Sequence, residues 1–296
     1  MRFDYFEPTS LDEASGLLRE GKGARKALAG GTDVVIQLRR RVVRTDGLVN
    51  LKRIPELSGW TCEPGRGLRL GACTPMRDLE TSAAVGDRFP SIREALQVVG
   101  SLQLRNLASV GGNLCNASPS ADTAPPLMAL GAMASLWTER SRRETVSVEN
   151  FFEGPGASVL GPGGLLLAVE VPEPEPFAGD AFERFTPRSA MDIAIASAAA
   201  AVTLDAAGQR VRAVRIALGA VAPTPIRAFR AEDLVREKEP NPKLLEWAGA
   251  AAMEECRPID DIRGTAAYRK ELIRILVQRV LRQAVERARA GGTETV

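Results

Sequence analysis

The sequence predicts an α+β fold built from three parts, and three features of its pattern support this. The first fifty residues alternate short strands and helices in a small β/α unit. Residues 57–171 mix strands and helices without the regular βαβ repeat of a doubly wound sheet. The last part pairs two strands and closes with two helices, and 296 residues exceed one typical domain.

The N-terminal part, residues 1–56, opens with a helix whose start is marked by a capping box. The Ser10 hydroxyl is suited to accept a bond from a helix-start N–H, and Glu13 can reach back to a second one. This helix is predicted to run to about Arg19, before two glycines. The other elements predicted here are strands at 25–29 and 47–51 and a helix at 34–42.

The central part, residues 57–175, ends in a stretch where proline alternates with glutamate. A strand is predicted at 68–72, and a helix begins at Thr74 with Pro75 in its first turn. Because proline lacks a backbone N–H, residues 172–176 cannot sustain regular hydrogen bonding. This stretch is interpreted as the boundary before the C-terminal part, residues 176–296.

In the C-terminal part, apolar strands at 193–204 and 211–219 flank a turn at 205–208. Helices follow at 243–256 and 268–289. The spacing within the second helix predicts a mostly apolar stripe, which needs a surface to pack against. The stripe consists of Leu272, Ile275, Leu276, Arg279, Val280 and Gln283. Its arginines, within the basic stretch 263–289, are interpreted as a solvated face.

The residue types restrict the chemistry. The chain has no histidine, which excludes Ser-His-Asp and Cys-His catalysis and histidine-ligated metals. Its four cysteines, Cys62, Cys73, Cys115 and Cys256, lie far apart without a CxxC pair, so no zinc site or iron–sulfur cluster is encoded and reduced structural thiols are expected. We identify no catalytic acid or base and no metal ligand. The chemistry must come largely from a cofactor.

Charge and hydropathy favour a cytoplasmic protein that binds no nucleic acid. The net charge of +2 lacks the basic excess of a nucleic-acid binder. The longest apolar stretches, such as residues 193–204, fall short of the ~20 residues of a membrane span. Asp4 and Glu7 stand where a signal peptide needs an apolar run, which favours the cytoplasm.

Two glycine pairs follow apolar runs, Gly30-Gly31 and Gly111-Gly112. Glycine lets backbone N–H groups turn inward and lets an oxyanion approach without a Cβ in the way. Neither loop matches a P-loop or a GxGxxG motif, and each alone is more often a plain turn. Two such loops together match a diphosphate, which presents two anionic groups.

The segment after the second loop, residues 113–126, is rich in small and polar residues, typical of a ligand-lining segment. Asp122 is suited to accept hydrogen bonds from a ribose diol. Capping of the following helix explains Asp122 equally well on sequence alone. Asp33 and Asp192 are interpreted as loop-ordering residues that bond nearby backbone N–H groups.

These motifs together resemble the FAD-binding medium subunit of the xanthine dehydrogenase and carbon monoxide dehydrogenase family. The resemblance spans nearly the whole chain, with the motifs in family order. It rests on residues 29–33, Arg105-Asn106, residues 109–113, residues 116–122, Met191-Asp192-Ile193-Ala194, residues 219–225 and Tyr268-Arg269.

The resemblance implies a vanillyl-alcohol-oxidase-type FAD-binding fold, whose C-terminal domain has a three-stranded antiparallel sheet and helices. FAD would lie between the first two parts. The pyrophosphate would be held by Ala29, Gly30, Gly31, Thr32 and Asp33 together with Ser109, Val110, Gly111, Gly112 and Asn113. The ribose would lie at Asp122, with Leu28 and Asn116 close to the cofactor, Leu166 on the adenine side and Arg184 near the flavin.

Members of this family are oxidoreductases that pass electrons from a molybdenum–pterin subunit through two [2Fe–2S] clusters on a small subunit to FAD, and then to an external acceptor. The resemblance therefore implies a flavin subunit, with molybdenum and iron–sulfur centres on partner chains, in a heterotrimer that dimerises. The substrate would meet the molybdenum subunit, so this chain does not specify it, and NAD, oxygen or quinone would reach the same flavin edge.

Two other functions stay open at this level. A free-standing FAD-dependent oxidoreductase would use the same loops without partners. An adaptor that binds no cofactor would use the glycine loops as plain turns, which leaves both loops and Asp122 without a shared purpose.

Overall fold

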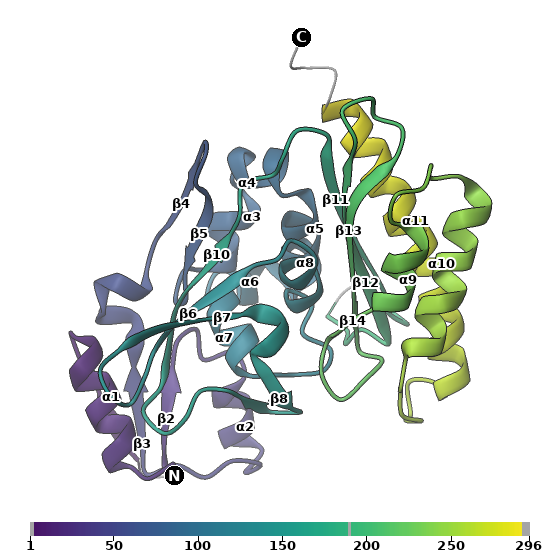
Figure 1. Cartoon of the computed structure of the whole chain (residues 1–296). Helices are drawn as coiled ribbons and strands as arrows, with labels where there is room; N and C mark the ends of the chain where they lie inside the picture. Colours follow the sequence, from purple (N-terminus) through teal and green to yellow (C-terminus); the bar gives the residue numbers. More distant parts are fainter. Residues whose placement is uncertain (1–2, 189–190, 292–296) are drawn as a thin grey trace.

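The N-terminal part folds as a small parallel sheet flanked by helices. The computed structural model describes residues 3–188 and 191–291. Strands β1 (Asp4–Phe6), β2 (Arg25–Leu28) and β3 (Gly47–Asn50) pair in the order β1-β3-β2, all parallel (Figure 1). Helix α1 (Leu11–Glu20) joins β1 to β2, and α2 (Val34–Arg39) joins β2 to β3. The predicted β/α unit is confirmed.

The capping of α1 is confirmed with one change. The Ser10 Oγ accepts from the Glu13 N–H at 3.3 Å, as predicted. The Glu13 carboxylate, however, accepts from the Thr9 N–H at 2.9 Å and not from that of Ser10. Helix α2 ends three residues earlier than expected, because the chain turns through a left-handed residue, Arg41, with φ 58°.

The central part is a five-stranded antiparallel sheet with helices on one face. Its order is β4-β5-β10-β6-β7, so the late strand β10 lies between two earlier hairpins. The strands are β4 (Trp60–Glu63), β5 (Gly67–Gly71), β6 (Met133–Trp137), β7 (Arg143–Ser147) and β10 (Leu165–Val171). A separate small hairpin pairs β8 (Phe152–Gly154) with β9 (Ala157–Ser158).

Short helices connect these strands. They are α3 (Met76–Glu80), α4 (Ala83–Arg88), α5 (Pro90–Val98), α6 (Leu102–Arg105), α7 (Val110–Cys115) and α8 (Ala124–Ala129). Single 3-10 turns lie at Leu51–Arg53, Pro55–Leu57 and Val148–Asn150. Pro75 precedes α3 as its N-cap, one position before the first turn in which it was expected.

The C-terminal part is an antiparallel sheet with helices on both faces. Its order is β11 (Ala178–Phe185), β12 (Ala196–Leu204), β13 (Val211–Gly219) and β14 (Ile226–Arg227), so a two-residue strand is added to the three expected ones. Helices α9 (Phe229–Val235), α10 (Pro242–Glu255) and α11 (Ala266–Gly291) cover the outer face. Helices α5 and α8 of the central part pack on the inner face (Figure 1).

Side chains of β10 alternate between two cores. Leu165 and Leu167 pack with Leu11, Ile54 and other residues against the N-terminal part. Leu166 points the other way, into the large core under the helices of the central part. This alternation, with a period of two residues, joins the first two parts of the chain through a single strand.

The packing stripe of α11 differs from the predicted one. Leu276 and Val280 are buried as expected, but Ile275 is 39% exposed. The buried face is instead completed by Ile273, Val277, Leu281, Ala284, Val285 and Ala288. Gly179 of β11 lies against the backbone of this helix. The buried residues keep the helical period, but the stripe is offset by one position from the predicted one.

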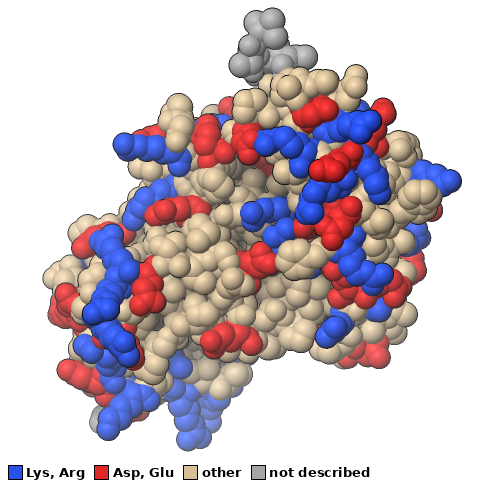
Figure 2. All heavy atoms as spheres, viewed as in Figure 1, with Lys and Arg blue, Asp and Glu red and all other residues tan. Residues whose placement is uncertain are grey.

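The arginines of α11 make specific contacts. Arg279 pairs with Glu183 at 2.7 Å and Arg287 with Glu94 at 2.5 Å, which ties the helix to β11 and α5. Arg269 is 4% exposed and donates to the carbonyls of Ile195 and Ala220. The solvated-face interpretation is therefore wrong for Arg269, and on the face shown in Figure 2 basic and acidic side chains are intermixed.

Along the described part of the chain, no helix combines the length and the apolar character needed to cross a membrane.

Candidate cofactor site

The first glycine loop, residues 29–33, connects the end of β2 to the start of α2. Gly31 has φ 74°, a conformation that favours glycine. A Cβ on Gly30 would collide with the backbone carbonyl of Leu107, which directly precedes the second loop. Two segments 77 residues apart thus meet backbone to backbone, which only glycine permits here.

The residues predicted as the second loop, 109–113, are instead the N-cap and first turn of α7, so the loop prediction is wrong here; the name second loop is kept for these residues. The Ser109 Oγ accepts from the Gly112 N–H at 3.0 Å and caps the helix. Gly111 packs against the backbone of Ala72, so its hydrogen atoms face the protein interior. A Cβ on Gly112 would instead lie 3.9 Å from the Ala29 Cβ, facing the first loop. Gly112 therefore borders the space between the loops, whereas Gly111 serves packing.

Side-chain hydrogen bonds join the two loops to the segment that follows. Gln37 of α2 donates to the Asn116 Oδ1 at 3.2 Å. The Thr123 hydroxyl donates to the Asn113 Oδ1 at 2.7 Å and so holds the neighbouring Asp122 beside α7. Of the expected residues, the structure thus brings together both glycine loops, Asn116 and the Asp122 segment.

Asp122 makes an ion pair and does not cap α8. Its Oδ2 accepts from Arg184 of β11 at 2.5 Å, and neither carboxylate oxygen bonds the start of the helix. The capping alternative is therefore excluded. The other oxygen, Oδ1, is buried and has no hydrogen-bond partner among the residues that the structure describes. Burial raises the pKa of Asp122 to about 6, against the opposing effect of Arg184.

The remaining expected residues lie in different surroundings. Leu28 is half-buried at the end of β2, next to Gly31. Val110 is buried in α7, and Thr32 is half-buried in the first loop. Leu166 is 3% exposed inside the central core, so its side chain points away from the N-terminal part and the first loop.

The two loop-ordering aspartates have different outcomes. Asp192 accepts from the N–H groups of Ile193 and Arg188, as expected. Asp33 makes no capping bond to α2, so the expectation is wrong for this residue. Desolvation raises the pKa of Asp33, as expected for a carboxylate beside protein without a donor to stabilise its charge.

Sequence reasoning missed three contributors to this site. They are Gln37, Thr123 and the backbone of Leu107. Thr123 adjoins Asp122, and Gln37 lies one helical turn after Asp33, so proximity to predicted residues was the available signal. The role of Leu107 depends on a backbone approach that carries no sequence signature.

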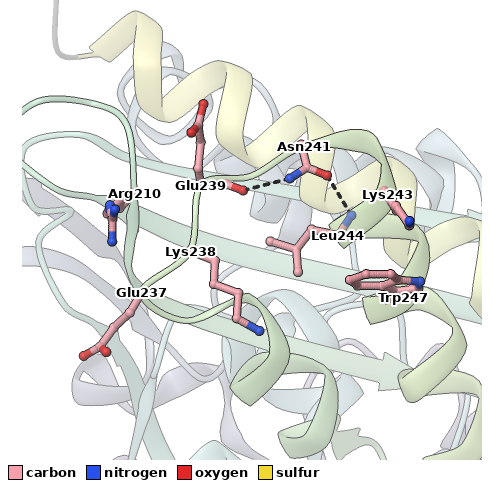
Figure 3. A pocket seen from close by; sticks show the side chains of 8 residues that line it. All are labelled: Arg210, Glu237, Lys238, Glu239, Asn241, Lys243, Leu244 and Trp247. Atoms are coloured by element: carbon pink, nitrogen blue, oxygen red, sulfur yellow. Dashed lines mark hydrogen bonds between the residues drawn. The ribbon is translucent and has the colours of Figure 1, made fainter.

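A pocket of about 490 Å³ lies elsewhere, on the C-terminal part (Figure 3). It is lined by Trp247 and Lys243 of α10, by Arg210 and by the loop before α10. The Lys243 ammonium lies 5.1 Å from the centroid of the Trp247 ring. Glu237 and Glu239 add the opposite charge. None of its lining residues belongs to the glycine loops or to the Asp122 segment, so this pocket is separate from the candidate cofactor site.

The four cysteines are all free thiols. Within the described residues, no group of three or more histidine, cysteine, aspartate or glutamate side chains is placed to hold a metal ion.

The loop arrangement fits a dinucleotide with a diphosphate. Gly112 has no side chain on the side that faces the first loop, which leaves room for a phosphate. The nearby Asp122 Oδ1 is buried and has no partner among the described residues. A buried acceptor of this kind is stabilised by a hydroxyl donor, which a ribose provides. FAD carries both groups, a diphosphate and a ribose.

Comparison with known proteins agrees with this geometry. Residues 1–174 match the family described as the FAD binding domain in molybdopterin dehydrogenase, and residues 181–284 match the CO dehydrogenase flavoprotein C-terminal domain. The xanthine dehydrogenase FAD-binding subunit of Escherichia coli O157:H7 is 32% identical over 289 residues, covering 97% of each chain. The carbon monoxide dehydrogenase medium chain of Hydrogenophaga pseudoflava is 32% identical, covering 96% of this chain and 97% of its own.

Solved structures give the same result. Carbon monoxide dehydrogenase from Hydrogenophaga pseudoflava aligns with a TM-score of 0.92 and 31% identity, over 97% of this chain and 98% of the other. Quinoline 2-oxidoreductase from Pseudomonas putida 86 aligns with a TM-score of 0.89 and 30% identity, over 98% and 99%. The resemblance noted from the sequence is confirmed: the chain belongs to the family of FAD-binding medium subunits of molybdenum-containing dehydrogenases.

Proposed function

We propose that this chain binds FAD between its N-terminal and central parts and serves as the electron-transferring subunit of a molybdenum hydroxylase. The observation that carries the proposal is the meeting of the two glycine loops, at Gly30 with Leu107 and at Gly112 facing Ala29. When bound, FAD supplies one- and two-electron redox chemistry, which the cofactor rather than the side chains performs.

The residues of this chain bind and position the cofactor. Backbone N–H groups of residues 29–33 and of the first turn of α7 would receive the pyrophosphate, apart from those of Gly112 and Asn113, which already donate to Ser109. The unpartnered Asp122 Oδ1 would accept from a ribose hydroxyl. Arg184, which the resemblance places near the flavin, would hold the Asp122 carboxylate in place for that bond.

Partner subunits would carry the molybdenum–pterin and the [2Fe–2S] clusters, in a dimer of heterotrimers. Exposed apolar side chains support a partner surface on this chain. Phe185 and Tyr268 stack edge to face at the end of β11, with both rings more than a third exposed, and Ile262 nearby in the chain is 98% exposed. Such exposure is typical of protein interfaces. The cytoplasmic location and the boundaries of the three parts stay predictions.

The proposal is tested by titrating the purified full-length chain with FAD and following absorbance and flavin fluorescence. The variant Gly112→Val places a branched side chain between the loops, with the new Cβ 3.1 Å from the Ser109 Oγ and 3.9 Å from the Ala29 Cβ. Gly111 is less suitable, because any side chain there strikes the Ala72 backbone and disturbs folding. A matched control is Gly16→Val, a helical glycine of α1 with no neighbour within 4 Å.

Wild type and Gly16→Val should bind FAD in equal amounts, one per chain. Gly112→Val should keep its thermal unfolding temperature close to that of the control and lose FAD binding. Equal FAD binding by Gly112→Val and wild type would contradict the assigned site. A well-folded wild type that binds no FAD would contradict the proposed function of the chain.

A further inference from the structure

We infer that the buried ion pair between Arg105 and Glu80 is a positioning device that sets the distance between the two glycine loops and thereby the affinity for FAD. Neither residue belongs to the loops, so Arg105 acts through the segment that it holds. The inference rests on the proposed function, since it concerns the same site.

The pair has the geometry of a rigid brace. The Arg105 Nε donates to the Glu80 Oε2 at 2.8 Å, and its second terminal nitrogen donates to Oε1 at 3.0 Å. The remaining terminal nitrogen donates to the carbonyl of Val99 at 3.0 Å. Both side chains are about nine-tenths buried. A two-pronged contact of a planar guanidinium with a carboxylate fixes orientation as well as distance.

The electrostatics keep Glu80 charged in this buried place. Burial on its own would raise the pKa of Glu80, but the hydrogen bonds and charges of Arg105 and Arg77 outweigh it and hold the pKa below its usual value. The ion pair is therefore intact at neutral pH. Loss of Glu80 would leave the buried Arg105 charge without its carboxylate, whereas loss of Arg105 would leave Glu80 with Arg77 alone.

The brace attaches the second loop to α3 at both ends of that helix. Glu80 at its C-terminal end holds Arg105, and the Met76 N–H at its N-terminal end donates to the carbonyl of Ala108 at 2.8 Å. The segment between Arg105 and Ala108 includes Leu107, whose carbonyl lies against Gly30 of the first loop.

A shift of this segment would change the space between the loops. Because Leu107 touches Gly30, outward movement separates the first loop from the second, and Ser109 moves with Ala108 through the chain. A pyrophosphate bound by N–H groups of both loops is sensitive to such a change, since hydrogen bonds weaken steeply with distance and angle. Arg105 is therefore expected to control cofactor affinity without touching the cofactor.

The test compares Arg105→Lys and Glu80→Gln with wild type in the full-length chain. Lysine keeps the charge of Arg105 but loses the two-pronged contact, and glutamine keeps the shape of Glu80 but loses its charge. Two variants are controls. Arg77→Gln removes only the more exposed partner of Glu80, and Arg227→Lys alters another buried two-pronged pair, with Glu232, in the C-terminal part.

Three measurements separate positioning from a general loss of stability: the Kd for FAD, the thermal unfolding temperature without FAD, and the circular dichroism of bound flavin in the visible range. Arg105→Lys and Glu80→Gln should each raise the Kd for FAD by about tenfold or more and change the flavin signal. Arg227→Lys should lower the unfolding temperature comparably while its Kd stays within about twofold of wild type.

Unchanged FAD affinity and flavin signal in Arg105→Lys and Glu80→Gln, with wild type binding FAD normally, would overturn the brace and leave the proposed function intact. An equal loss of affinity in Arg227→Lys would also overturn it, because the effect would then follow stability. No FAD binding by folded wild type would overturn both.

Discussion

Arg184 of β11 donates to the Oδ2 of Asp122 at 2.5 Å, and this ion pair links the C-terminal sheet to the segment that borders the glycine loops. Both side chains are at least nine-tenths buried. The third part of the chain thereby holds a residue of the candidate cofactor site in the second part. Replacing either partner should affect both folding and cofactor binding.

The ion pair predicts strong coupling in stability. Arg184→Leu should lower the free energy of unfolding by about 3 kcal/mol, because it leaves the Asp122 carboxylate buried without its partner. In the Asp122→Asn background the same replacement should cost at least about 1 kcal/mol less. Urea unfolding of the four proteins without FAD measures this. Simple additivity of the two single effects would show that the pair does not couple them.

Cofactor binding should depend on pH through Asp122. Its pKa is raised to about 6, so the carboxylate is charged at neutral pH and protonated as the pH falls through that value. A protonated carboxyl is a poorer acceptor for a ribose hydroxyl, and FAD affinity should therefore fall below about pH 6. FAD titrations between about pH 5 and about pH 8 test this in wild type and Asp122→Asn. A pH profile that is the same in both would contradict a role for Asp122.

Stability should respond to pH through Asp180, which is outside the cofactor site. Its carboxylate accepts from the Ser91 N–H at 2.6 Å, and burial raises its pKa to about 6 from an ordinary 3.8. A raised pKa means that the folded state binds the proton more tightly, so this group contributes most to stability at low pH. That contribution is lost as the pH rises through about 6.

The comparison of wild type with Asp180→Asn isolates this effect. Asparagine retains an acceptor for Ser91 but does not titrate, so the variant should gain stability relative to wild type as the pH rises from 3.8 to about 6. The gain should be of the order of 2 kcal/mol. Carboxylates with a lowered pKa, such as Asp205 and Asp261, change the stability with pH in the opposite direction. Their effect is the same in wild type and variant, so it cancels in the difference between the two. A difference that does not change with pH would refute the assignment.

The contact of β11 with α11 predicts a severe effect of a small substitution. A Cβ on Gly179 would collide with the backbone of α11 at Ala284 and Ala288. Gly179→Ala should therefore destabilise the chain by about 1–3 kcal/mol or more, because backbone atoms cannot move aside as a flexible side chain does. Gly16→Ala in α1, which meets no neighbour, should be neutral or slightly stabilising. Similar thermal unfolding temperatures for the two variants would contradict this packing.

The sequence by itself determined the features that depend on short stretches of chain. The Ser10 cap, the first glycine loop and the strand Val211–Gly219 follow from residues whose backbone preferences act within a few positions. The absence of histidine limited the chemistry to that of a cofactor. Strands β10 and β11 were not predicted, because a buried apolar run is compatible with strand or helix until its neighbours are known.

Only the tertiary structure decided which distant residues meet. Asp122 was suited to cap a helix or to bind a ribose, and the approach of Arg184 from β11 excluded the cap. The sequence does not explain why residue 30 must be glycine; in the structure the carbonyl of Leu107 occupies the place of a side chain. In each case the deciding contact joins residues far apart in the chain, and local preference does not encode it.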